Sequence, residues 1–173
     1  AVNRLSNFMD YIPLMISERL IDVNQSYIGQ TIYVLGQFRS FNRHEERKNR
    51  LVLSVFVREL ELLGEIPEDI KTNQIFLDGF ICKPPVYRRT PLGREICDVM
   101  LAVPRAFQRA DYLPCILWGR TAQEASRCHT RDKIGITGRL QSRVYTKLTE
   151  EGAEERTAYE ISALTAQIPM DLL

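Results

Sequence analysis

The feature of this 173-residue sequence that most constrains its fold is an internal repeat. Setting Ala1 against Ala102 aligns AVNRLSNFMDYIPLMISER with AVPRAFQRADYLPCILWGR without a gap, and both segments place the motif Asp-Tyr-aliphatic-Pro in an apolar run. Further along, TIYVLGQFRSF aligns with KIGITGRLQSR, and RLVLSVFVREL aligns with RTAYEISALTA. A repeat of this length predicts two copies of one domain.

The repeat also predicts where the domains begin and end. The second copy is complete and covers residues 73–169, whereas the first copy covers residues 1–61 and lacks any counterpart of residues 73–101. Residues 62–72 form a short polar link with a glycine and a proline, as is typical of a domain boundary. Because a sheet without two of its strands exposes unpaired edges, we expect the natural chain to continue upstream of Ala1.

Apolar and polar residues alternate along several segments of the second copy, which predicts strands. After Asp98 the second of these segments is apolar at nearly every position, which predicts burial on both faces. Prolines and a glycine predict a loop at 83–93, and helix-forming residues predict a short helix at 120–129. The predicted strands are 73–82, 94–103, 111–118, 133–145 and 156–168.

The order of three strands, a short helix and two strands is that of the OB-fold, a five-stranded Greek-key barrel. We therefore predict an all-β protein built from two tandem OB-folds, the first lacking its first two strands in this chain.

Charge is distributed unevenly along a chain whose net charge is only +1. From Gly79 to Lys147 there are thirteen lysines and arginines against five acids, whereas the residues from Leu148 onward contain six acids and one arginine. A basic segment next to an acidic one predicts a surface that binds a polyanion. A mixed, solvated face is the alternative that charge alone leaves open.

Several classes of protein are disfavoured by the sequence. The four cysteines (Cys82, Cys97, Cys115 and Cys128) form no Cys-x-x-Cys pair, and no metal-binding spacing or catalytic constellation is evident. We therefore expect reduced thiols, no metal, no cofactor and no enzymatic activity. No apolar run reaches the roughly 20 residues that a membrane helix needs, so we expect no membrane association.

The second copy resembles the bacterial single-stranded DNA-binding protein family (SSB) along its whole length. The resemblance is carried, in order, by NQIFLDGFICKPPVYRRTPLGREICDVMLAV, DYLPCILWGRTAQEA, DKIGITGRLQSRVYT and RTAYEISA. Two copies in one chain are similar to the family's tandem variant, which assembles as a dimer. The resemblance thus implies a homodimer with four OB-folds.

The resemblance also implies which residues bind DNA. Family positions that stack on bases carry aromatic residues here, and the family's phosphate-binding loop is arginine-rich here. In the first copy a poorer strip contains Arg39 and Phe41 on one strand face. The predicted DNA-binding residues are Arg88, Arg89, Arg94, Arg105, Phe107, Tyr112, Trp118, Arg139, Arg143, Tyr145 and Lys147 in the second copy, with Arg39 and Phe41 added from their shared strand face in the first.

These residue types suit an unpaired strand, which offers phosphates and bases that have lost their stacking partners. Each base stacked on a ring contributes about 1–3 kcal/mol without sequence preference. On the fourth strand Arg139, Arg143 and Tyr145 share one face at period two. Trp118 and Tyr112 are also consistent with a place in the core.

We therefore expect a non-enzymatic protein that binds single-stranded DNA with little sequence preference and protects it in replication, recombination and repair, with the second copy dominating. We expect a bacterial cytoplasmic location with the nucleoid, and possible partners among replication and repair proteins. The alternative is an OB-fold adaptor between proteins, such as a primosome or mobile-element accessory subunit, which the near-neutral total charge favours. RNA binding also stays open, because no feature of the sequence reads a 2′-hydroxyl.

Overall fold

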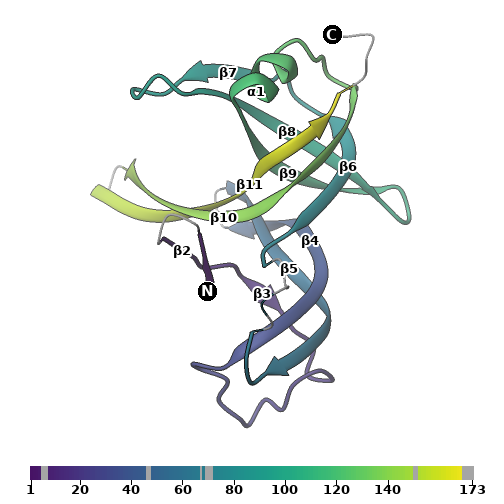
Figure 1. The fold of residues 1–173 in the computed structure, drawn as a ribbon, viewed down its shortest axis with the longest axis vertical. Coiled ribbons are helices and arrows are strands. Elements are labelled where there is room, and N and C mark those ends of the chain that lie inside the picture. The colour runs from purple at the N-terminus through teal and green to yellow at the C-terminus, as the bar shows by residue number, and fades with distance from the viewer. Residues whose placement is uncertain (5–7, 46–47, 67, 69–71, 150–151, 169–173) are drawn as a thin grey trace. The chain divides into compact units, whose positions relative to one another are not determined.

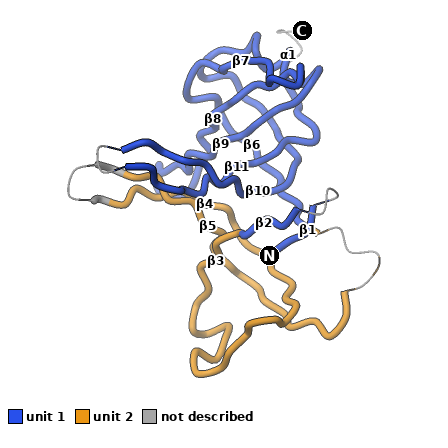
Figure 2. The backbone as a smooth tube through the Cα atoms, turned by 90° about the vertical axis from the view of Figure 1, so that its left-hand side faces the viewer, with its two compact units in different colours: residues 1–11, 73–173 blue, residues 12–72 orange. Residues whose placement is uncertain are grey.

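The structure, a computed structural model, describes the chain apart from residues 5–7, 46–47, 67, 69–71, 150–151 and 169–173 (Figure 1). The chain divides into two compact units, drawn in blue and orange in Figure 2. Unit 1 contains Ala1–Tyr11 and Asn73–Leu173, and unit 2 contains Ile12–Thr72. Within the described residues, no helix has the length and apolar character that a membrane span requires.

Unit 1 is built around a closed β-barrel. Its sheet has the strand order β6-β10-β11-β9-β8-β7, and an additional pairing between β6 and β8 closes the ring. β9 and β11 pair in parallel, whereas the other ladders of this sheet are antiparallel. The elements are β6 (Ile75–Ile81), β7 (Val86–Arg89), β8 (Glu95–Arg105), β9 (Arg109–Trp118), α1 (Gly119–Ala125), β10 (Lys133–Thr149) and β11 (Gly152–Gln167). This topology is the predicted OB-fold.

Alternation along the strands separates the barrel interior from its surface. On β9 the side chains of Leu113, Cys115 and Leu117 are buried, and on β10 those of Ile134 and Ile136 are buried. Each fully buried aliphatic side chain of this kind stabilises the fold by about 1.5–3 kcal/mol. The helix α1 contributes Ala122 and Ala125 to the same core.

The structure differs from the sequence-based prediction at three places in this barrel. Residues 86–89, predicted as loop, form the strand β7, which pairs with β8 between the flanking prolines. The helix ends at Ala125 rather than at residue 129. On β8 the side chains of Val99 and Leu101 are buried but those of the alternate residues are only half-buried, so burial on both faces is wrong.

Past residue 138, β10 loses its pairing with β6 and continues as a strand with one free edge. Side chains, rather than another strand, form hydrogen bonds with the backbone N–H and C=O groups along this edge. The side chain of Asn73 accepts from Leu140 N–H at 2.8 Å and donates to Leu140 C=O at 2.7 Å. Asp10 accepts from Ser142 N–H at 2.7 Å, and Arg4 donates to Ser142 C=O at 2.8 Å.

Residues 1–11 belong to unit 1 because of these contacts. They carry the short strands β1 (Val2–Asn3) and β2 (Met9–Asp10), which pair with each other. The compact units therefore follow tertiary contacts, whereas the boundaries 1–61, 62–72 and 73–169 follow the repeat. β5 extends through Leu63 into the predicted link, and residues 67, 69–71 and 169 lie outside the described residues.

Unit 2 contains a three-stranded sheet in the order β3-β5-β4. Its strands are β3 (Leu14–Met15), β4 (Thr31–Glu45) and β5 (Lys48–Leu63). β3 pairs in parallel with β5 at Leu14↔Val55, as β9 does with β11 at Cys115↔Ile161. In the alignment of the repeat, Leu14 aligns with Cys115 and Val55 aligns with Ile161, so the two pairs are equivalent.

The long hairpins of the two units also share their register. β4 and β5 have a bulge between Leu35 and Gly36, and β10 and β11 have one at the aligned positions Thr137 and Gly138. A Cβ atom at either glycine would overlap a backbone carbonyl, that of Phe56 or that of Ser162. The close approach explains why the repeat keeps glycine at this position.

Candidate nucleic-acid interface

The ladder between β10 and β11 places three predicted binding residues on one side of the sheet. Cross-strand partners point to the same side, and the pairs include Arg139↔Ser162, Arg143↔Ala158 and Tyr145↔Arg156. The opposite side of β10 at Ile134, Ile136 and Leu140 faces the barrel core, so Arg139, Arg143 and Tyr145 face outward. Lys147 follows with the same alternation.

β9 contributes two aromatic residues to this outward side. Because Leu113, Cys115 and Leu117 fill the core, the alternate residues Tyr112 and Trp118 point away from it. Trp118 is half-buried, and its indole Nε1–H donates to Ser162 Oγ at 3.1 Å. Trp118 is therefore neither fully core nor fully free, and its ring is fixed beside β11.

The strand β7 completes the surface. The ladders pair Arg88 with Ile96 and Ile96 with Trp118, so Arg88 lies on the same side of the sheet as Trp118. We call this surface the basic face and define it by Arg88, Trp118, Arg139, Arg143, Tyr145 and Lys147. Tyr112 also points outward, but the ladders pair it with Ala102 and pair Ala102 with Phe80, so Tyr112 lies towards β6 rather than with these residues. Three strands, β7, β9 and β10, thus contribute residues to one face of the barrel.

Glu160 lies within the basic face on β11, where it is the ladder partner of Gln141. Its carboxylate accepts from Gln141 Nε2 at 2.6 Å and lies 3.8 Å from Arg143 Nε. The pKa of Arg88 is raised, first by its hydrogen bond with Asp98 and then, against the effect of burial, by the charges of Asp98 and Glu160. Arg88 and Arg143 therefore share one electrostatic neighbourhood.

The end of the basic face combines a cation with a ring. The guanidinium of Arg143 lies 5.6 Å from the ring centroid of Tyr145, within the range of a cation–π contact. Both side chains are exposed. This pair offers a base a stacking partner beside a phosphate-binding group.

Not all predicted residues join this face. Arg89 alternates with Arg88 and therefore points to the other side of β7, where it forms an ion pair with Glu95 at 3.0 Å. Arg105 points to the other side of β8, with its Nη1 3.2 Å from Asp111 Oδ1. Arg94 is exposed in the turn that links β7 to β8.

Phe107 lies at the tip of the hairpin between β8 and β9. Its side chain is 94% exposed, and its backbone φ of +59° lies in the left-handed region that non-glycine residues rarely adopt. An exposed ring on a strained hairpin tip contributes nothing to the core. The next residue, Gln108, has a positive φ of 54° as well, and consecutive positive φ values are typical of a tight hairpin turn. A role for Phe107 in contacting DNA stays a prediction.

The sequence analysis missed Arg4 and Asp10. Asp10 is fully buried and lies 2.5 Å from Arg4 Nη2 and 3.5 Å from Arg139 Nη1, so it holds a residue of the basic face in place. The repeat contained a signal for this, because Arg4 and Asp10 align with Arg105 and Asp111, which also form an ion pair.

The sequence analysis also missed Glu160 and Ser162. Their signal is the period-two alternation of β11, which places them opposite Gln141 and Arg139.

In unit 2, Arg39 and Phe41 share one side of β4, as predicted from alternation. The guanidinium of Arg39 lies 5.1 Å from the ring centroid of Phe56 and its Nε donates to Gln37 Oε1 at 3.2 Å. Phe41 is partly exposed.

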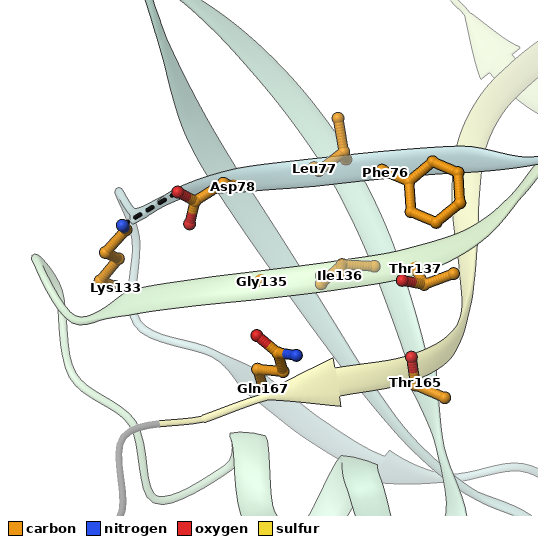
Figure 3. A pocket seen from close by; sticks show the side chains of 9 residues that line it. All are labelled: Phe76, Leu77, Asp78, Lys133, Gly135, Ile136, Thr137, Thr165 and Gln167. Atoms are coloured by element: carbon orange, nitrogen blue, oxygen red, sulfur yellow. Dashed lines mark ion pairs between the residues drawn. The ribbon is translucent and has the colours of Figure 1, made fainter.

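A hollow of about 440 Å³ lies elsewhere on the barrel, on the outer side of β6, the start of β10 and the end of β11 (Figure 3). Lys133 Nζ and Asp78 Oδ2 form an ion pair at 2.9 Å across one end of it. None of the predicted DNA-binding residues lines it. Its residues are Phe76, Leu77, Asp78, Lys133, Gly135, Ile136, Thr137, Thr165 and Gln167.

The fold and the site together define a class. An OB barrel whose outer strands present arginines and aromatic rings has the architecture of an oligonucleotide-binding protein. The sequence model of the single-strand binding protein family matches residues 72–169, and the chain belongs to this family.

Individual relatives agree with this assignment. Single-stranded DNA-binding protein B of Bacillus subtilis is 39% identical over 87 residues, which are 46% of this chain and 75% of that protein. The single-stranded DNA-binding protein of Thermus thermophilus is 28% identical over 157 residues, 82% of this chain and 59% of that protein. These relatives are named for single-stranded DNA, which disfavours the adaptor alternative.

The crystal structure of wild-type single-stranded DNA-binding protein from Thermus aquaticus superposes with a TM-score of 0.60 at 25% identity. The superposition covers 82% of this chain and 60% of the Thermus aquaticus chain. A deletion mutant of the same protein gives a TM-score of 0.66 at 23% identity. The chain thus spans about 60% of the length of the Thermus aquaticus protein.

Proposed function

We propose that this protein binds single-stranded DNA, with little sequence preference, across the basic face of unit 1. The observation that carries the proposal is the gathering of Arg88, Trp118, Arg139, Arg143 and Tyr145 on one outward side of a single barrel. The names of the relatives from Bacillus and Thermus give independent support.

The chemistry of the basic face suits an unpaired strand of any sequence. Guanidinium groups bind phosphates, which every nucleotide carries, and aromatic rings stack on bases because every base has a π-face. A protective role in replication, recombination and repair follows from such sequence-tolerant binding. We expect the protein to act in the cytoplasm of a bacterium, together with the nucleoid and with replication or repair proteins.

The single tryptophan, Trp118, makes a direct test of binding simple. We expect oligo-dT to quench its fluorescence, because a base stacked on the indole offers a route for the excited state to relax. We also expect the affinity to fall with salt, with a log–log slope of about −0.7 for each phosphate neutralised. Absence of any response at low salt would instead favour the adaptor alternative, and a stronger response to oligo-rU would favour RNA.

We also propose that two chains assemble as a homodimer that brings four OB-folds together, the first copy in each chain contributing the weaker site. Linking several modest sites raises avidity through effective concentration. Sedimentation of the free protein should give the mass of two chains. A single-chain mass over the concentration range in which DNA binds would contradict the homodimer and leave the binding proposal intact.

A further inference from the structure

The arginines of the basic face already have carboxylate partners on the protein itself. Arg88 Nε donates to Asp98 Oδ2 at 2.8 Å, and its Nη2 reaches Asp98 Oδ1 at 3.3 Å, so the contact is forked. Arg143 Nε lies 3.8 Å from a Glu160 carboxylate oxygen. Both acids come from strands that neighbour those of their arginines, β8 beside β7 and β11 beside β10.

The ladders place both acids on the basic face itself. Asp98 is the partner of Ile116, and Ile116 is the partner of Ser162, whose hydroxyl accepts from Trp118. Glu160 lies two residues before Ser162 on the same strand and therefore on the same side. The field of Glu160 also reaches Arg88, as the raised pKa of Arg88 indicates.

We propose that Asp98 and Glu160 act as internal competitors of DNA phosphate and so set the affinity and the salt dependence of single-strand binding. The inference rests on the proposed function. An arginine that leaves a carboxylate for a phosphate exchanges one anionic partner for another. The free energy of binding gained in this exchange is smaller than the free energy that an unpaired arginine would gain from the same phosphate. The carboxylate left behind also repels the incoming strand.

The same exchange flattens the salt dependence. A phosphate neutralised by arginine releases its condensed cation. A carboxylate that loses its arginine in the same step attracts a cation in turn, and this uptake offsets part of the release. The number of phosphates contacted by the basic face is therefore larger than the number that the salt slope reports.

The test compares Asp98→Asn with a matched control, Asp78→Asn, in the full chain. Each substitution removes one negative charge and breaks one ion pair with a cation. The side chain is 41% exposed at Asp98 and 65% exposed at Asp78. Asp78 lies beside Gly135 at the start of β10, four residues or roughly 13 Å before Arg139 and eight residues or roughly 25 Å before Arg143 along the strand. At physiological salt the Debye length is about 8 Å, so the control should not influence the basic face.

We expect Asp98→Asn to bind fluorescein-labelled oligo-dT about two- to fivefold more tightly than the wild type, as judged by anisotropy, because an exposed ion pair of this kind is weak. Its salt slope should be steeper by up to about 0.7, the contribution of one phosphate. Asp78→Asn should match the wild type in both respects. Glu160→Gln, a second and independent variant, should shift affinity in the same direction as Asp98→Asn.

The outcomes separate this inference from the proposed function. If the wild type binds oligo-dT but Asp98→Asn and Glu160→Gln bind no more tightly than Asp78→Asn, the competition proposal is wrong and the binding proposal stands. If the wild type does not bind at any salt concentration, both fail. Circular dichroism of each variant checks that the barrel is intact.

Discussion

At the scale of single residues, Asp10 shows how a buried charge is stabilised. Its carboxylate has no exposed side-chain surface, and burial alone would raise its pKa. Hydrogen bonds from Arg4 and from the Ser142 backbone, together with the charges of Arg4 and Arg139, outweigh burial and lower the pKa below its ordinary value. The ionised form is therefore favoured in the folded protein.

This shift predicts how stability depends on pH. An aspartate whose pKa is lowered by folding stabilises the protein above its unfolded pKa of about 3.9, and this contribution is lost as the pH falls through the lower, folded value. We expect Asp10→Asn to lower the free energy of unfolding by about 1–3 kcal/mol at pH 7, because two arginines lose their anion. The difference from wild type should begin to shrink near pH 4, where Asp10 becomes protonated in the unfolded state, and should be lost only below the lower, folded pKa, where Asp10 is protonated in both states.

Urea denaturation at several pH values measures this effect, with Asp78→Asn as the control. The Asp78–Lys133 pair is exposed, so its loss should change stability by less than about 0.5 kcal/mol. A wild-type advantage over Asp10→Asn that stays constant from pH 7 to pH 3 would show that Asp10 contributes by shape rather than by charge.

At the scale of elements, the long β10–β11 hairpin carries the basic face, and its geometry depends on one bulge. The register shifts between Thr137 and Gly138, just before the strand reaches Arg139. A Cβ atom at Gly138 would lie less than 3.0 Å from the backbone carbonyl oxygen of Ser162. Cβ atoms in proteins essentially never come so close to another residue's atoms. The glycine thus allows two strands to approach where the barrel ends and the basic face begins.

Two glycines of the same strand allow a matched test. We expect Gly138→Ala to destabilise the protein by about 1–3 kcal/mol, the usual cost of overpacking, because backbone must move to admit the methyl group. Gly135→Ala should have a small effect, since its Cβ would meet the nearest atom at 3.5 Å, an ordinary van der Waals contact. Thermal unfolding of the two variants measures the difference, and equal melting temperatures would contradict the close approach.

At the scale of the whole molecule, the repeat produces two hairpins with the same register but different surface chemistry. Arg143 and Tyr145 occupy the positions that align with Phe41 and Arg43, so the first copy also has a ring and cations on its strand. The second copy also has Arg88 and Trp118, whereas the first copy has no counterpart of residues 73–101 in this chain and has Ser17 at the position that aligns with Trp118. We therefore expect the second copy to dominate binding.

Substitutions in the full chain test this expectation. Tyr145→Ala should weaken binding of oligo-dT by about 1–3 kcal/mol, the contribution of one stacked base. Phe41→Ala should weaken it by clearly less, and Phe76→Ala, which removes a 71% exposed ring at the hollow, should leave it unchanged. Fluorescence titration measures all three, and an equal loss for Tyr145→Ala and Phe41→Ala would show that the two copies contribute alike.

The sequence by itself determined the OB-fold, the repeat and the types of residue that form the basic face. The alternation of apolar and polar residues and the positions of prolines and glycines between strands are local properties of the sequence. They were enough to place the strands β6, β8, β9, β10 and β11 to within a few residues. The same alternation placed Arg139, Arg143 and Tyr145 on one side of β10, because side chains on a strand alternate whatever the strand packs against.

Only the tertiary structure decided which residues from different strands meet. That Arg88 shares a face with Trp118 while Arg89 points away depends on how β7 pairs with β8, and four residues between prolines did not predict a strand. That Asp10 holds Arg139, and that Glu160 lies among the arginines, depends on contacts between segments more than a hundred residues apart or on opposite strands. Such contacts are set by the free edge of β10 and by ladder register, which arise only when the whole barrel closes.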